Sequence, residues 1–185
     1  MPGNEFIADY EENKKDIEYW FSIKCEQKYR RFAELLKSED EEPTWKNIVD
    51  LYRYDKRLIF NCYNYLSFLE EYLRASIVRN SSNKEEEYEK WQSENVGHLK
   101  GPIIELFDKG LFEYKGNNLG QDLELMRLLR NDVCHNHIII ETDYQSSINA
   151  LYRLLPNNYK KTFIEKITES TDKLCVSDKW IVKFN

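Results

Sequence analysis

Apolar residues recur every three, four or seven positions along most of the chain, which is the spacing of an amphipathic helix. The strongest stripe runs from about residue 45 to residue 79 and predicts a long helix against which others pack, with a break possible at Tyr52–Asp55. Its N-cap is predicted to be Thr44, because Pro43 disfavours helix just before it. The stripe consists of Leu51, Leu58, Cys62, Tyr65, Leu69, Leu73 and Ile77.

Shorter windows with the same period predict further helices. The 185 residues include only 6 glycines and 4 prolines, fewer turn signals than a β-sandwich or barrel needs. An all-α fold is therefore predicted, with a glycine-containing loop or small hairpin over residues 108–120 and a short strand or packed coil at Trp180–Phe184. Helices are expected over 5–36 (one or two), 84–95, a short stretch to about 107, 121–137, 144–155 and 158–174.

Acidic residues are concentrated at the N-terminus. Residues 1–43 hold 12 acidic and 7 basic side chains, while the whole chain has a net charge of −6. The run Ser38–Thr44 also interrupts the helical pattern. We therefore expect an acidic helical segment over 1–43, packed on a helical bundle over 44–185 within one compact domain. The nearly neutral remainder leaves room for a local basic site, but not for a large electrostatic footprint on nucleic acid.

The cysteines and the apolar runs favour a cytoplasmic protein. Cys25, Cys62, Cys134 and Cys175 lie far apart and form no CxxC pair, which favours reduced thiols over disulfides. No apolar run approaches the roughly 20 residues that span a bilayer, and the acidic N-terminus has no apolar signal region. We therefore expect no membrane partner.

The segment LELMRLLRNDVCHNHIII contains two of the three histidines, with two arginines close by. At about 100° per residue, an α-helix would turn Arg130, Asn131 and His135, together with Arg127 and His137, away from the core face. Histidine can exchange protons near neutral pH, and the guanidinium fork of arginine matches phosphoryl oxygens. These residues are therefore the candidates for chemistry. The predicted core face consists of Leu125, Met126, Leu129 and Val133.

Other interpretations of this segment stay open. Arg130 and His135 would also suit a plain surface, where a histidine near a helix C-terminus is favoured by the helix dipole. Zinc binding by Cys134, His135 and His137 is less consistent with the pattern, since neighbouring residues diverge on a helix and no fourth ligand is indicated. Leu128 lies on the polar side, which suggests that this face is covered by a partner, plausibly a second copy.

The six residues Arg130-Asn131-Asp132-Val133-Cys134-His135 resemble the Arg-x4-His signature of the HEPN superfamily, whose members are helical bundles and often endoribonucleases. A polar residue commonly follows the arginine there, and Asn131 fits that position. Residues 51–77 resemble the long helix of the Abi-like family, which is associated with abortive phage infection. The segments Tyr54–Leu58 and Leu69–Arg74 carry this second likeness.

The chain departs from both family patterns. Abi-like proteins usually read Arg-Asn-x-x-Ala-His-His, whereas here Cys134 replaces the alanine and Asn136 separates the two histidines. HEPN toxins that are inactivated by AMP transfer carry a tyrosine two residues beyond the motif histidine. That position is His137 here, so this form of regulation is not supported.

The resemblance implies an HEPN-like bundle that dimerises and cleaves RNA without metal or other cofactor, in phage defence or as a toxin. Two copies would bring two Arg130 and two His135 into one cleft, with Asn131 orienting the histidine or the phosphate. Arg127 and His137 would contact RNA, and an antitoxin or regulatory protein is a further possible partner. The rival functions are a non-catalytic HEPN-type module that binds RNA, nucleotide or protein, and a helical scaffold.

Overall fold

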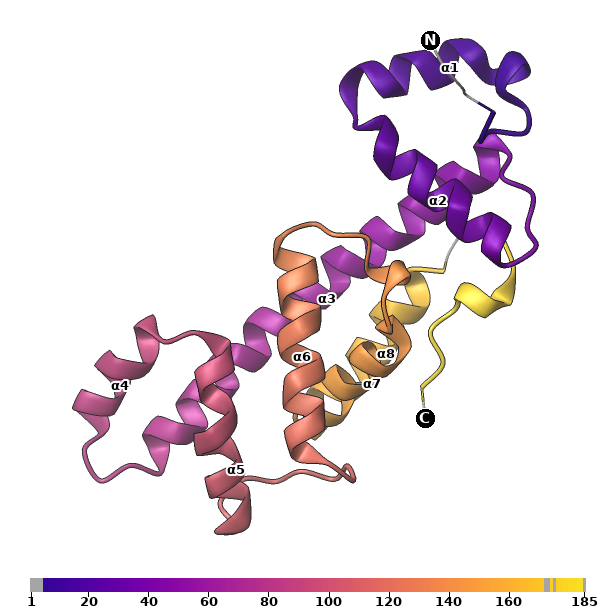
Figure 1. The fold of residues 1–185 in the computed structure, drawn as a ribbon. Coiled ribbons are helices and arrows are strands. Elements are labelled where there is room, and N and C mark those ends of the chain that lie inside the picture. The colour runs from indigo at the N-terminus through magenta and orange to yellow at the C-terminus, as the bar shows by residue number, and fades with distance from the viewer. Residues whose placement is uncertain (1–4, 172–173, 175, 185) are drawn as a thin grey trace. The chain divides into compact units, whose positions relative to one another are not determined.

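The computed structural model describes residues 5–171, 174 and 176–184, and all regular structure in these ranges is helical (Figure 1). The all-α fold predicted from the periodicity is thus confirmed. The helices are α1 (Tyr10–Ile23), α2 (Glu26–Ser38), α3 (Trp45–Arg79), α4 (Lys84–Ser93), α5 (Lys100–Asp108), α6 (Leu119–Cys134), α7 (Tyr144–Leu154) and α8 (Asn157–Glu169), with 3-10 turns at η1 (Val96–Leu99), η2 (Ile139–Glu141) and η3 (Asp178–Trp180).

Helix α3 runs for 35 residues without the break that was possible at Tyr52–Asp55. Its start has the predicted cap, since Thr44 Oγ1 accepts the Asn47 N–H at 3.2 Å. A second cap comes from Asp9, whose Oδ1 accepts the Trp45 N–H at 2.6 Å. The predicted apolar stripe is buried apart from the half-buried Tyr65, and its fully enclosed members are Leu51, Leu58, Cys62, Leu69 and Leu73.

The chain forms two compact units, which are Met1–Leu58 with Thr168–Ile181 (unit 1) and Ile59–Ile167 with Val182–Asn185 (unit 2). This division falls inside α3. Hydrogen bonds explain why residues 168–181 belong to unit 1. Arg57 Nε donates to the Ser170 carbonyl and the Tyr54 hydroxyl donates to the Trp180 carbonyl, each at 2.8 Å.

Unit 1 has an aromatic core. Rings from the N-terminal loop, α1, α2 and the first part of α3 pack with centroids 5.3–6.2 Å apart, in stacked, tilted and edge-to-face pairs. Trp180 is also buried in this unit, and its Nε1 donates to Glu41 Oε1 at 2.8 Å. The rings of this core belong to Phe6, Phe21, Tyr29, Phe32, Trp45 and Tyr52.

Unit 2 contains the rest of α3, helices α4 to α7 and most of α8. Helix α6 packs on α7 and also contacts α5 (Figure 1). The loop predicted around the three glycines lies between α5 and α6, and Gly110 adopts a φ of 70°, where a side chain would be strained. Helix α4 confirms the helix expected over 84–95, and it buries Trp91.

The C-terminal part of the chain differs from the expected helix over 158–174, because α8 ends at Glu169. Among the described residues that follow, 182–184 form packed coil and no strand. The backbone of Lys183 is bound by α7, since Asn149 Nδ2 donates to the Lys183 carbonyl and the Lys183 N–H donates to Gln145 Oε1. The packed-coil alternative is therefore the one observed.

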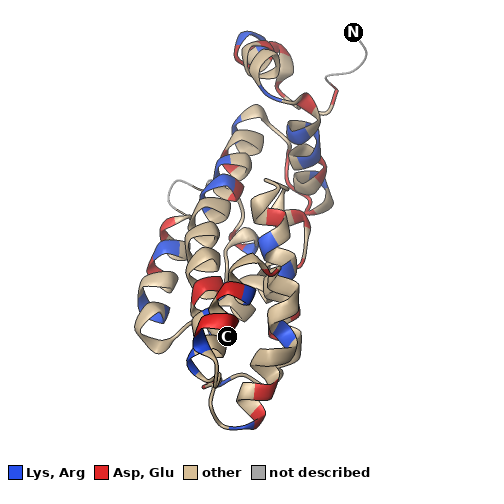
Figure 2. Cartoon of the chain, turned by 90° about the vertical axis from the view of Figure 1, so that its left-hand side faces the viewer, with Lys and Arg blue, Asp and Glu red and all other residues tan. Residues whose placement is uncertain are grey.

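Charged residues of both signs are interspersed along the helices (Figure 2). In the described ranges, no helix has the length and apolarity that crossing a bilayer demands. Cys25 and Cys134 are exposed and Cys62 is buried, and these three form no disulfide within the described part of the chain. Cys175 lies outside the described residues.

Candidate functional site

Helix α6 carries most of the residues that the sequence singled out. It begins at Leu119, and the side-chain oxygen of the N-cap Asn118 accepts the Gln121 N–H at 3.0 Å. Leu125, which was predicted in the core face, is only half-buried. The apolar side chains that α6 does bury are Leu119, Leu123, Met126, Leu129 and Val133, so its opposite side is left for polar groups.

Helix α6 ends in a left-handed turn. Cys134 is its last residue, His135 is the C-cap and Asn136 has a φ of 55°. The Asn136 N–H donates to the carbonyl three residues before it, and the His137 N–H donates to the Asp132 carbonyl at 2.8 Å. These two bonds form a Schellman motif, in which asparagine takes the position usually held by glycine.

The expectation of a helix to about His137 is therefore wrong by three residues. Asn136 stops the helix because its left-handed backbone cannot continue a right-handed one. The helical projection consequently does not apply to His137, whose direction is set by the turn. The signal was present in the sequence, since asparagine tolerates this conformation better than other residues with a side chain.

Arg130 lies beside α3. Its Nε donates to Glu70 Oε1 at 3.0 Å, and its side chain keeps 37% of its surface exposed. The hydrogen bond to Glu70 raises the pKa of the Arg130 guanidinium, against the opposing effect of burial. In the described part of the chain no hydrogen bond occupies its two terminal nitrogens, which leaves donors of the kind that bind phosphoryl oxygens.

Glu70 is the residue that sequence reasoning missed. Its side chain is 13% exposed and also forms an ion pair with Arg74, whose Nη1 lies 3.4 Å from Glu70 Oε2. Arg74 is itself anchored by a bond from its Nη2 to the Glu94 carbonyl at 3.1 Å. One carboxylate thus sits between two arginines and fixes the stem of Arg130. The spacing of Glu70 and Arg74 was a local signal for an ion pair on α3, but nothing in it pointed to Arg130.

His135 and His137 lie side by side at the end of α6. Their ring centroids are 5.7 Å apart and their planes differ by 28°. His137 Nδ1 lies 3.0 Å from Asp132 Oδ1, while the His135 ring has no hydrogen bond among the described residues. Both side chains are exposed. The turn at Asn136 therefore brings together two imidazoles that a continuous helix would separate.

Asn131 and Leu128 complete the open side of α6. The His135 backbone N–H donates to the Asn131 carbonyl at 3.0 Å, so the two residues stand one turn apart as expected. The Asn131 side chain is half-buried and makes no hydrogen bond within the described ranges. Leu128 is 44% exposed, which confirms that an apolar side chain lies on the polar face.

Arg127 is held away from the histidines. Its guanidinium binds Glu124 of the same helix, with Nε 3.1 Å from Oε1, and the second Glu124 oxygen lies 3.8 Å from Lys100. Its aliphatic stem lies against Gly97, where an added Cβ would meet Arg127 Cδ at 3.3 Å. The structure thus supplies Arg127 with an internal carboxylate partner.

The zinc alternative finds no support in the geometry. Across the described residues, no group of three or more histidine, cysteine, aspartate or glutamate side chains is placed to hold a metal ion. Cys134, His135 and His137 accordingly do not form a ligand set.

The arrangement offers an arginine with free terminal donors, a carboxylate that positions it and two exposed imidazoles at one end of a helix. Such groups can bind a phosphodiester and exchange protons with it. Comparisons with protein-family models, curated proteins and solved structures found no match for this chain.

Proposed function

We propose that this protein is a metal-independent endoribonuclease of the HEPN type, which acts in abortive phage infection or as a toxin. The observation that carries the proposal is the contact between Arg130 and Glu70. It joins the two stretches that resemble HEPN and Abi-like proteins, through two residues that are 60 positions apart in the chain. A contact between these stretches is expected if both belong to one site.

The reaction needs little from the protein, because RNA carries its own nucleophile. The 2′-oxygen attacks phosphorus, the bond from phosphorus to the 5′-oxygen breaks, and the products are a 2′,3′-cyclic phosphate and a 5′-hydroxyl. A base takes the 2′-hydroxyl proton and an acid supplies one to the 5′-oxygen. His135 is exposed and suited to one of these roles, and the terminal nitrogens of Arg130 suit the phosphorane oxygens.

A second imidazole is needed for the other proton transfer. In the proposed dimer it is His135 of a second copy, which also brings a second Arg130. His137 of the same chain is the competing source, because its ring stacks on His135 and its Nδ1 is engaged by Asp132. The rate of cleavage by His137→Ala distinguishes between these two sources of the second imidazole. We expect only a small loss of rate, since the dimer already supplies two copies of His135.

The exposed Leu128 supports the dimer. A two-fold axis through this face would bring each leucine near its symmetry mate, so a pair of introduced charges would repel. We therefore expect Leu128→Glu to be monomeric in sedimentation and to lose cleavage, while Leu111→Glu, at another exposed leucine, stays dimeric. A dimer that is equally stable in Leu128→Glu would remove the support for a composite site.

The decisive experiment is cleavage of single-stranded RNA in the presence of EDTA, with end-group analysis for the cyclic phosphate. His135→Ala should lower the rate by about 10²–10⁴-fold, and Arg130→Ala by about 10²–10³-fold. His98→Ala and Arg79→Ala are matched controls, because both side chains are exposed elsewhere in unit 2. Activity that disappears with EDTA, or that persists in His135→Ala, would refute the mechanism.

The rival from another class is a non-catalytic module that binds RNA, nucleotide or protein. It is favoured by the net charge of −6 and by Asn136, which separates the two histidines that the Abi-like pattern has side by side in the sequence. This rival predicts that pure wild-type protein binds RNA and leaves it intact. Neutralising Glu70 should then strengthen binding without producing any cleavage.

A further inference from the structure

Two lysines of unit 1 contact the same aromatic ring. Lys24, in the connection between α1 and α2, donates from Nζ to the Tyr52 hydroxyl at 3.0 Å, and its nitrogen lies 4.5 Å from the ring centroid. Lys56, one turn further along α3, has its Nζ 5.6 Å from that centroid. Cations from two different segments thus converge on Tyr52, in a unit whose N-terminal part is strongly acidic.

Lys28 of α2 adds a third cation. Burial lowers the pKa of the Lys56 ammonium, the neighbouring Asp55 opposes this, and Lys28 lowers the pKa further by repulsion between like charges. Asp55 is fully buried, with Oδ2 3.5 Å from Lys56 Nζ. Lys28 is therefore a neighbour of Lys56, and adjacent like charges of this kind favour the binding of a polyanion.

Exposed aromatic surface adjoins these lysines. Lys24 Nζ also lies 4.9 Å from the centroid of the Trp20 ring. Next to Trp20 on α1, Tyr19 packs edge-on against that ring with centroids 5.6 Å apart, yet leaves 60% of its own surface open to solvent. Cations that follow a backbone, combined with aromatic faces on which bases stack, are the two parts of a site for single-stranded nucleic acid.

We propose that this lysine–aromatic face, formed by Lys24, Lys28, Lys56, Tyr19 and Trp20, binds single-stranded RNA, with phosphates at the lysines and a base on Tyr19. An acidic peptide would also pair with the lysines, but it would not use the open ring of Tyr19. The choice of RNA over DNA rests on the proposed endoribonuclease function, whereas the residues of this face belong to unit 1 and include none from α6.

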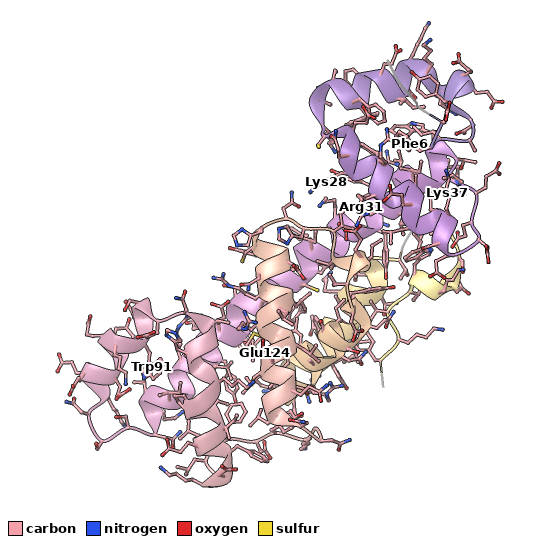
Figure 3. All side chains as sticks on the ribbon, in the orientation of Figure 1. Phe6, Lys28, Arg31, Lys37, Trp91 and Glu124 are labelled. Atoms are coloured by element: carbon pink, nitrogen blue, oxygen red, sulfur yellow. The ribbon has the colours of Figure 1, made fainter. Side chains whose placement is uncertain are left out.

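The test is fluorescence anisotropy of a labelled single-stranded RNA titrated with full-length His135→Ala protein, in which cleavage is disabled. The test variant adds Lys24→Gln and Lys28→Gln and leaves Lys56 in place to keep Asp55 paired. Its control adds Lys14→Gln and Lys37→Gln, which make the same change of charge at exposed positions of unit 1. Figure 3 shows that Lys28 and Lys37 lie toward opposite ends of α2.

We expect the test variant to bind about tenfold more weakly at low salt, and the slope of log affinity against log salt to fall by about 0.7 for each lost phosphate contact. The control should keep the affinity and the slope. Tyr19→Ala should weaken binding about fivefold or more through lost stacking, while Tyr88→Ala on α4 should not. Equal weakening by the test and control pairs would mean that RNA senses only the overall charge, and would overturn the proposal.

Two further outcomes would also overturn it, namely no RNA binding by His135→Ala protein and preferential binding of single-stranded DNA or polyglutamate. These results are distinct from failure of the proposed function. If wild-type protein cleaves nothing but binding still depends on Lys24 and Lys28, the endoribonuclease proposal alone fails. If cleavage depends on His135 but neither lysine affects binding, the lysine–aromatic face alone fails.

Discussion

Among the described residues of unit 2, two arginine–carboxylate pairs join α6 to another helix, and they differ in how many nitrogens of the arginine bind the carboxylate. In the first, Arg153 of α7 donates two hydrogen bonds to the Asp122 carboxylate, from Nε to Oδ2 and from Nη2 to Oδ1, both at 2.6 Å. Asp122 is only 3% exposed. In the second, Arg130 touches Glu70 with one nitrogen at 3.0 Å and stays 37% exposed.

The comparison distinguishes an ion pair that holds two helices together from one whose arginine still has donors for a ligand. The Asp122 carboxylate also accepts the Tyr114 hydroxyl at 2.7 Å, so three donors satisfy it inside the protein. Removing one member of such a pair leaves a poorly solvated charge, whereas an exposed pair can be replaced by water. Arg153 therefore ties α7 to the start of α6, while the terminal donors of Arg130 remain free for a ligand.

The largest effect on stability is expected from Asp122→Asn. The variant keeps the shape of the side chain but removes the charge opposite Arg153, and it should lower the free energy of unfolding by about 3 kcal/mol in urea titrations. Asp108→Asn, at an exposed carboxylate of α5, is the control and should change stability by less than about 0.5 kcal/mol. A loss at Asp122 below about 1 kcal/mol would mean that the buried pair is not the stronger one.

Tyr114→Phe should have the next largest effect, about 1 kcal/mol for one lost hydrogen bond. Burial and the bond to Asp122 raise the pKa of Tyr114 from 10.0 to about 12. A raised pKa stabilises the folded state below pH 10, and that stabilisation is lost as the pH rises from 10 towards about 12. The gap between wild type and Tyr114→Phe in unfolding free energy should therefore narrow over this range. A constant gap would contradict the assignment.

The turn that brings the two histidines together should respond to position 136. Because Asn136 has a φ of 55°, Asn136→Ala should be less stable than Asn136→Gly by about 1 kcal/mol. The comparison of two variants cancels the loss of the asparagine side chain itself. Equal unfolding free energies would indicate that this residue leaves the left-handed region in solution, and the stacked arrangement of His135 and His137 would then be lost.

These elements show what could be predicted from the sequence. The all-α fold, the apolar stripe of α3 and the Thr44 cap follow from local rules, namely apolar period and capping chemistry, which act within a few residues. The same rules placed Arg130, Asn131 and His135 off the core face of α6. The predicted end of α6 was wrong because the helical period of apolar residues continues past Asn136. The backbone conformation of that single residue decides where the helix stops.

Other features were not predictable because they depend on tertiary contacts. Glu70 and Arg130 are 60 positions apart, and no local pattern on α3 shows which side chain will cross to α6. The union of residues 168–181 with the N-terminal unit likewise depends on contacts such as that of Arg57 with Ser170. Composition does not reveal such contacts, because compact units are set by which surfaces pack together.

The smallest effect on stability is expected at the open pair, and it completes the comparison. Arg130→Ala should lower the free energy of unfolding by less than about 1 kcal/mol, because water can solvate the Glu70 carboxylate once the arginine is gone and Arg74 still lies 3.4 Å away. Arg153→Ala, measured in the same urea titration, should cost clearly more. If Arg130→Ala were as destabilising as Arg153→Ala, Arg130 would be a structural residue, and its loss could no longer be interpreted as the loss of a phosphate ligand. A small loss of stability together with a large loss of RNA cleavage would instead assign Arg130 to the reaction.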